Sequence, residues 1–144
     1  MRLLLDIPVK MCRNMNQNII ISILKEMNFD ISPHHLAILK VLYEKQRSNI
    51  TEVVDELNIT KPQMTASTDK LVLLNYISRE NDSRDRRKIY LTLTGEGEEV
   101  VRRINIRMEN YASEALQELS ELELEQLEGG LKVLQKLCIN CQEK

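Results

Sequence analysis

A cluster of basic side chains occupies a short polar stretch of the chain, formed by Arg84, Asp85, Arg86, Arg87 and Lys88. Residues 79–88 hold five Lys or Arg, three Asp or Glu and no apolar side chain. Guanidinium groups bind phosphates, and an arginine at a hairpin tip suits a narrow minor groove, where negative potential is concentrated. We expect Arg87, or otherwise Arg86, to enter that groove while Asp85 holds a neighbouring arginine. The alternative is a solvated turn with internal ion pairs.

A second polar group lies upstream, where Thr60 and Gln63 have the spacing of a capping box and Pro62 falls in the first turn of a predicted helix. A glutamine amide can pair with adenine, a lysine with guanine or phosphate, and threonine or alanine methyl groups can touch thymine. For Gln63 and Thr60, a cap and a DNA contact are both open. The residues predicted to face DNA from this helix are Thr60, Lys61, Pro62, Gln63, Thr65, Ala66, Ser67 and Lys70.

Short helices and a hairpin must position these two groups. The predicted helices cover residues 33–46, 50–57 and 61–75, each after a residue suited to an N-cap. Apolar residues alternate from Ile89 to Leu93, which predicts a half-buried strand paired with a strand over residues 76–79. A helix-turn-helix followed by a basic hairpin is a winged helix, so the predicted fold is mainly α with a small β-hairpin wing.

Three further predicted helices are too apolar for the winged-helix block to cover. They span residues 7–29, 95–119 and 121–141, and the last carries a heptad-like seam of leucines and cysteines. This surplus of apolar surface predicts a symmetric homodimer in which the three helices interlock. We therefore expect a single domain over residues 1–144, with a DNA-binding lobe at 30–94 and dimerisation helices at 1–29 and 95–144.

The composition is typical of a soluble fold whose basic sites are local. The formal net charge is −2, and residues 91–144 carry eleven Asp or Glu against six Lys or Arg. Any DNA affinity must then be salt-sensitive and need both lobes of a dimer. No apolar run approaches the ~20 residues of a membrane span, and the apolar run before Asp6 is too short for a signal peptide. With no phosphate loop or nucleophile elbow in the sequence, we expect neither an enzyme nor a cofactor.

The three cysteines suggest a redox hypothesis. Cys138 and Cys141 form a C-x-x-C, and Cys12 lies on the first predicted helix, within reach of a partner's C-terminus. All three also continue the apolar seams of their helices, where free cysteine packs as a small hydrophobe, and this is the preferred interpretation. No second Cys/His pair has the spacing of metal ligands, so no metal is expected. An odd cysteine count without an export signal favours a reducing cytoplasm.

The order of elements, the Ile31-Ser32-Pro33 entry to the second helix and the wing resemble the MarR family of multiple antibiotic resistance regulators. That family's wing has Asp-x-Arg and then a strand ending in Leu-Thr-x-x-Gly, which stand here as Asp85-Arg86-Arg87 and Leu93-Thr94-Gly95-Glu96-Gly97. The resemblance covers nearly the whole chain. It implies a homodimeric transcription regulator whose two lobes bind one pseudo-palindromic site on double-stranded DNA. It also implies a repressor released by a small phenolic or apolar ligand, or by cysteine oxidation.

The resemblance places a ligand pocket between the dimer helices and the DNA-binding lobe. Its predicted lining is Met15, Ile19, His35, Leu39, Tyr43 and Met108. The alternatives are that most of these residues belong to the core and that His34 and His35 form a solvated helix start. Two other functions stay open: a cysteine-based redox sensor of the same fold, and a winged-helix protein-interaction module that does not bind DNA.

Overall fold

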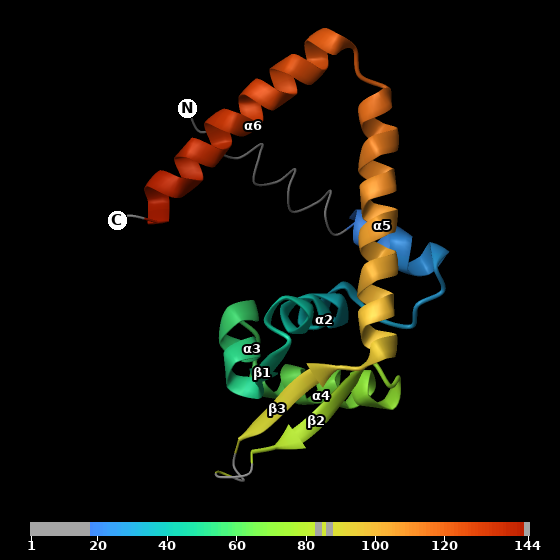
Figure 1. Ribbon diagram of the computed structural model, residues 1–144, viewed down its shortest axis with the longest axis vertical. Helices are drawn as coiled ribbons and strands as arrows, with labels where there is room; N and C mark the ends of the chain where they lie inside the picture. The colour runs from blue at the N-terminus through green and yellow to red at the C-terminus, as the bar shows by residue number, and fades with distance from the viewer. Residues whose placement is uncertain (1–17, 83–84, 86–87, 143–144) are drawn as a thin grey trace. The chain divides into compact units, whose positions relative to one another are not determined.

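The computed structural model describes residues 18–82, 85 and 88–142, with side chains described as far as residue 136. A helical segment over residues 18–26 comes first. The elements that follow are α2 (Pro33–Lys45), β1 (Arg47–Asn49), α3 (Ile50–Leu57), α4 (Lys61–Leu73), β2 (Ile77–Asn81), β3 (Ile89–Leu93), α5 (Gly95–Gln117) and α6 (Glu121–Gln142) (Figure 1). The predicted fold class, mainly α with a β wing, is confirmed.

Helix boundaries in the winged-helix region follow from local capping chemistry. Ser32, Asn49 and Thr60 are N-caps of α2, α3 and α4, and each is part of a capping box with the residue three positions later. Asn58, at the end of α3, and Asn75, after α4, have φ of 49° and 58°, the left-handed conformation that asparagine tolerates. These boundaries agree with the sequence predictions to within about two residues.

The sheet has three strands, not the two that the sequence predicts. Strand β3 lies in the centre, antiparallel to β2 and to the short β1, in the order β1-β3-β2. Strand β1 places Ser48 opposite Leu91, and the side chains of both are fully buried. No apolar alternation marks Arg47-Ser48-Asn49 as a strand. The pairing depends on β3, more than 40 residues later in the chain.

The chain divides into two compact units, Met1–Met108 (the first unit) and Glu109–Lys144 (the second unit). The core of the first unit is aliphatic, with Leu39, Leu42 and Leu71 fully buried. Besides α2, α3, α4 and the sheet, it includes Ile23 from the segment 18–26 and Ile104 from α5. The core therefore includes residues that come before and after the predicted lobe, residues 30–94, in the sequence.

A close junction joins the wing to α5 within the first unit. The Thr94 hydroxyl accepts a hydrogen bond from the backbone N–H of Gly97 at 3.0 Å and donates one to the carbonyl of Asn75 at 2.6 Å. A Cβ at Gly97 would overlap the backbone carbonyl of Tyr76, whereas one at Gly95 would meet nothing within 4 Å. The Leu-Thr-x-x-Gly pattern thus combines a helix cap with a glycine that allows backbone to approach backbone.

The second unit buries few of its apolar side chains. Every side chain of α6 from Glu121 to residue 136 is exposed, as far as the structure describes them. The exposed apolar residues of α6 are Leu122, Leu124, Leu127, Leu131, Val133 and Leu134. Within the described parts of the chain, no helix has the combination of length and apolar character that a bilayer span requires.

Candidate nucleic-acid interface

The first two turns of α4 form an exposed polar surface. Lys61, Pro62, Gln63, Thr65 and Ala66 are all exposed. The opposite side of the helix holds buried Met64, Thr68 and Leu71, which fix its orientation in the lobe. Ser67 lies on that inner side with an exposed fraction of 6%, so its hydroxyl is not on the outer surface where the sequence analysis placed it.

Gln63 closes the capping box that its spacing predicts. Its Oε1 accepts hydrogen bonds from the Thr60 backbone N–H at 3.0 Å and the Thr60 hydroxyl at 2.9 Å. The Gln63 backbone N–H lies 3.4 Å from the Thr60 hydroxyl oxygen. Paired recognition of adenine needs both the oxygen and the nitrogen of the amide. Gln63 could make that contact only after releasing Thr60.

Thr65 and Lys70 also have partners within the lobe. The Thr65 hydroxyl donates to the Lys61 carbonyl at 3.1 Å, which leaves its methyl group and a lone pair for other contacts. Lys70 Nζ lies 3.0 Å from the carboxylate of Asp30, in the turn before α2. Lys70 thus links α4 to the start of α2. It lies further along α4 than the exposed first two turns.

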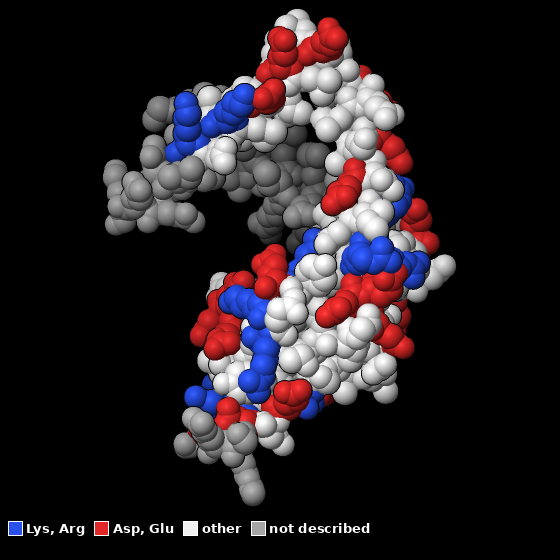
Figure 2. Space-filling view, in the orientation of Figure 1, with Lys and Arg blue, Asp and Glu red and all other residues white. Residues whose placement is uncertain are grey.

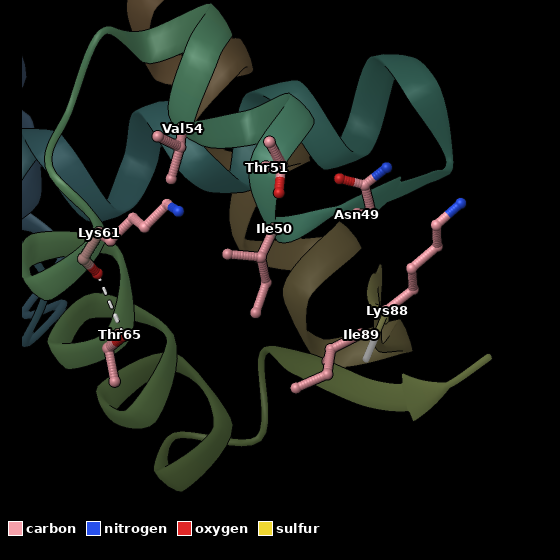
Figure 3. Close-up of a pocket in the computed structure, with 8 residues that line it drawn as sticks. All are labelled: Asn49, Ile50, Thr51, Val54, Lys61, Thr65, Lys88 and Ile89. Atoms are coloured by element: carbon pink, nitrogen blue, oxygen red, sulfur yellow. Dashed lines mark hydrogen bonds between the residues drawn. The ribbon is translucent and has the colours of Figure 1, made fainter. Parts of the chain in front are cut away.

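A concave site of about 500 Å³ lies where α3, α4 and the base of the wing meet. Figure 3 shows Ile50 between Thr65 of α4 and Ile89 of β3, with Lys61 on the α4 side and Lys88 on the wing side. The remaining lining residues are Asn49, Thr51 and Val54. The lining combines two ammonium groups and the polar side chains of Asn49, Thr51 and Thr65 with apolar residues, and its positive charge suits an anionic group. The sequence pattern puts Lys61 and Lys88 in separate elements and does not predict this cavity.

The described part of the wing tip is held by backbone hydrogen bonds. The Asp82 N–H donates to the Lys88 carbonyl, and the Lys88 N–H donates to the Asp85 carbonyl, both at 2.9 Å. The Asp82 carboxylate accepts from the Asp85 N–H at 2.9 Å, which is the turn-forming role that aspartate commonly has. Arg84, Arg86 and Arg87 lie outside the described residues, so their predicted DNA contacts stay predictions.

Arg79 joins the wing to α4, a contact that the sequence pattern does not predict. From β2, its guanidinium donates to the hydroxyl of Thr68 at 2.5 Å and to the carboxylate of Asp69 at 2.6 Å. Thr68 is fully buried, and its hydroxyl lies 2.9 Å from the Met64 carbonyl of the same helix. A separate ion pair, Lys45–Glu56, joins α2 to α3. Hydrogen bonding to Glu56 raises the pKa of Lys45.

Acidic and basic side chains are intermixed on one face of the winged-helix region (Figure 2). Figure 2 shows blue and red atoms interspersed on this face of the lobe, with no uniformly basic surface. On the sheet, the guanidinium of Arg47 stacks 3.9 Å from the ring centroid of Tyr90 and lies 3.7 Å from Glu80. Any affinity of this face for a polyanion would come from a few placed cations, in agreement with the near-neutral composition.

The described residues of the predicted ligand pocket have other roles. Leu39 is fully buried and Ile19 packs against the core. Met108 Sδ accepts a long hydrogen bond from Lys40 Nζ at 3.7 Å, and Tyr43 is 40% exposed. His35 takes part in the cap of α2. None of them lines the cavity beside α4. Met15 lies outside the described residues, and a pocket at this place stays a prediction.

The cysteine hypothesis is left open. Cys12 lies outside the described residues, as do the side chains of Cys138 and Cys141, whose backbone belongs to α6. Among the described residues, no group of three His, Cys, Asp or Glu side chains is placed to hold a metal ion.

Comparison with known proteins identifies this arrangement. The family model "Transcriptional regulator SarA/Rot" matches residues 18–104. YpoP, an uncharacterised helix-turn-helix-type transcriptional regulator of Bacillus subtilis, is 32% identical over 82 residues, which are 57% of this chain and 58% of YpoP. The chain thus spans little more than half the length of this relative, and 51% of a second Bacillus subtilis regulator, YkoM.

Solved structures show the same fold. The apo form of MarR from Escherichia coli matches with a TM-score of 0.77 at 19% identity, covering 90% of this chain and 95% of MarR. FabT from Streptococcus pneumoniae, in complex with DNA, matches with a TM-score of 0.71 at 22% identity, covering 94% and 96% of the two chains. The winged-helix fold and the resemblance to the MarR family are confirmed.

Proposed function

This chain belongs to the SarA/Rot family of winged-helix transcriptional regulators, and from that premise we propose that it binds double-stranded DNA as a homodimer. The observation that carries the proposal is the surface of the first unit. There, the exposed turns of α4 and the base of the wing border one concave site whose lining includes Lys61 and Lys88.

In this proposal α4 enters the major groove by its first two turns. Lys61, Thr65 and Ala66 are exposed there, and the methyl groups of Thr65 and Ala66 would touch the base edges. Asp69 and Lys70, further along the helix, are held by Arg79 and Asp30 and keep the helix in place. Gln63 closes the capping box of α4 in the free protein and becomes a base contact only if it releases Thr60.

The concave site beside α4 would receive a backbone phosphate of the DNA. The site has an ammonium group from each of two elements, and the amide of Asn49 and hydroxyl of Thr51 lie near the start of α3. A helix N-terminus and flanking lysines favour an anion. Beyond this site, the wing residues Arg84, Arg86 and Arg87 would continue to the minor groove, with Asp85 and Asp82 shaping the turn.

The second unit supplies the dimer contact in this proposal. Leu124, Leu127, Leu131 and Leu134 recur at spacings of three and four along one face of α6, and all are exposed in the single chain. Burying such a seam against a second copy removes apolar surface from water at about 25 cal/mol per Å². The dimer would set the distance between two recognition helices at about 34 Å, one DNA turn.

We further propose repression as the mode of regulation, with a small apolar or phenolic ligand as the releasing signal. An effector that binds the dimer more tightly than the DNA complex would shift DNA affinity by a typical coupling of about 1–3 kcal/mol. Adding a panel of phenols to the protein–duplex complex tests this, since affinity unchanged by every compound in the panel would remove the ligand from the proposal.

The direct test is duplex selection on the purified protein, followed by fluorescence anisotropy at several salt concentrations. Lys61→Ala and the double change Arg86→Ala/Arg87→Ala should each weaken binding about tenfold or more. Each should reduce the steepness with which the logarithm of DNA affinity falls with the logarithm of salt concentration, by about one for every phosphate that the variant no longer neutralises. Lys132→Ala is the matched control, because it removes a positive charge from α6, where Lys132 pairs with Glu128.

Unchanged affinity in the Lys61 and Arg86/Arg87 variants would contradict the DNA-binding surface. If the native protein selects no duplex and remains folded, the protein-interaction module becomes the better account of this winged helix.

A further inference from the structure

Helix α2 begins with a capping box whose closing residue is a histidine. The Ser32 backbone N–H donates to His35 Nδ1 at 3.0 Å, and the Ser32 hydroxyl lies 2.8 Å from the same nitrogen. The other boxes in the described part of the chain are closed by Glu52, Gln63 and Glu123. Those side chains accept hydrogen bonds across the whole neutral pH range, whereas an imidazole does so only while it is uncharged.

The geometry fixes the protonation state of His35. A backbone N–H is a donor only, so His35 Nδ1 must present its lone pair to Ser32, and the imidazole proton lies on Nε2. Protonation would fill that lone pair and turn the acceptor into a second donor facing the Ser32 N–H. It would also place a positive charge at the start of α2, the end of the helix that carries partial positive charge.

The surroundings of His35 connect it to the recognition helix. The titratable and charged groups that act on it are Lys70 of α4, His34 on its own helix and Asp30 in the preceding turn. Lys70 and Asp30 form an ion pair at 3.0 Å, which anchors α4 to the entry of α2. A cation at His35 would repel Lys70 and attract Asp30, and so would weaken the pair from both sides.

We propose that His35 is a pH-sensitive latch: uncharged, it closes the cap of α2 and leaves the Lys70–Asp30 tie intact, and protonated, it opens both. The latch acts on the placement of the recognition helix rather than on any residue that faces DNA.

The direction of the pH effect follows from linkage. Burial, with further contributions from Lys70 and His34, lowers the pKa of His35 below its ordinary value of 6.5, while Asp30 opposes this shift. The folded chain then binds fewer protons than the unfolded chain in the window between the two pKa values. Stability is therefore fully present above about pH 6.5 and falls as the pH drops from there through the folded pKa.

The chain offers a matched pair of variants, because His34 and His35 are its two histidines. His35→Gln keeps an acceptor for the Ser32 N–H and does not titrate, while His34→Gln removes the neighbouring imidazole. Urea unfolding is measured at about pH 7.5 and about pH 5.5. When the pH falls from about 7.5 to about 5.5, the folding equilibrium constants of the native chain and of His34→Gln should fall about fivefold further than that of His35→Gln. A fivefold change in this constant is the typical contribution of one helix cap. Equal pH dependence in His35→Gln and the native chain would overturn the latch, even if His34→Gln is less stable at both pH values.

A second measurement tests the tie to α4, and it rests on the proposed DNA binding. Anisotropy with the selected duplex should show a loss of affinity towards pH 5.5 that is smaller in His35→Gln than in the native chain. Equal loss in both would overturn the link to the recognition helix. If the native chain binds no duplex at either pH, the proposed function fails, and the latch is decided by the unfolding measurement alone.

Discussion

The two units of this chain use the same kinds of aliphatic side chain in different ways. In the first unit, Leu36, Leu39 and Leu42 of α2 have at most 1% of their surface exposed. In the second unit, Leu122 and Leu131 of α6 are 63% and 56% exposed. The first unit has a complete core of its own. The second unit leaves the apolar side chains of α6 exposed in the single chain, as far as the structure describes them.

This difference separates the two parts of the proposed function. The winged-helix lobe needs no partner to hold α4, because its core, the Arg79 contact and the Lys70–Asp30 pair lie within one chain. In the proposal, the spacing of two lobes on DNA would depend instead on the second unit and a second copy. Substitutions in the first unit should therefore alter stability at any protein concentration, whereas substitutions in α6 should alter stability through association of two chains.

A pair of identical substitutions gives the largest expected contrast. Leu39→Ala removes a fully buried side chain and should lower the free energy of unfolding of the first unit by about 2–5 kcal/mol. Leu131→Ala should leave that core intact and instead weaken the dimer. Thermal unfolding over a hundredfold range of protein concentration distinguishes them, because only the dimer contribution depends on concentration.

Gln126→Arg is the control on α6, since Gln126 is exposed but lies off the leucine seam. The comparison breaks down if Leu131→Ala destabilises the chain equally at every concentration, which would mean that α6 packs within its own chain.

The wing–α5 junction allows a sharper test within the first unit. Gly97→Ala places a methyl group against the Tyr76 carbonyl and should destabilise the unit by about 1–3 kcal/mol. Gly95→Ala meets no neighbour and should be neutral or stabilise α5 by up to about 1 kcal/mol. Urea denaturation of the two variants measures the difference, and equal stability would show that the backbone contact is not required.

A smaller effect is expected at the link between wing and recognition helix. Arg79→Met removes the hydrogen bonds to Thr68 and Asp69 and should cost about 1–2 kcal/mol. Arg102→Met breaks an exposed pair with Glu99 one turn away on α5 and should cost less than about 0.5 kcal/mol. Urea denaturation provides the measurement, and an effect as small for Arg79→Met as for Arg102→Met would contradict a tie between β2 and α4.

Local features of the sequence predicted much of the fold. The caps at Ser32, Asn49 and Thr60 and the left-handed turn at Asn58 depend on residues within four positions of each other, so spacing alone identifies them. Strand β1 escaped prediction because it exists only through pairing with β3. The apolar excess of α6 was visible as a pattern, and its exposure in the single chain agrees with the surplus of apolar surface predicted from the sequence.

The candidate site was predictable in part. The exposed residues of α4 follow from helical periodicity once Met64 and Leu71 are assigned to the core. The cavity between Lys61 and Lys88, the burial of Ser67 and the pairing of Lys70 with Asp30 arise from tertiary packing, which a linear pattern does not encode. A histidine three residues after an N-cap serine was readable in the sequence, but glutamate and glutamine are the usual closing residues of a capping box.

Sedimentation equilibrium of the protein with its selected duplex tests the central claim most directly, because it reports association and DNA binding together. The account predicts two chains of 16.8 kDa on each duplex and a dimer in the absence of DNA. A complex containing one chain, or a free protein that remains a monomer at concentrations where it binds DNA, would contradict it.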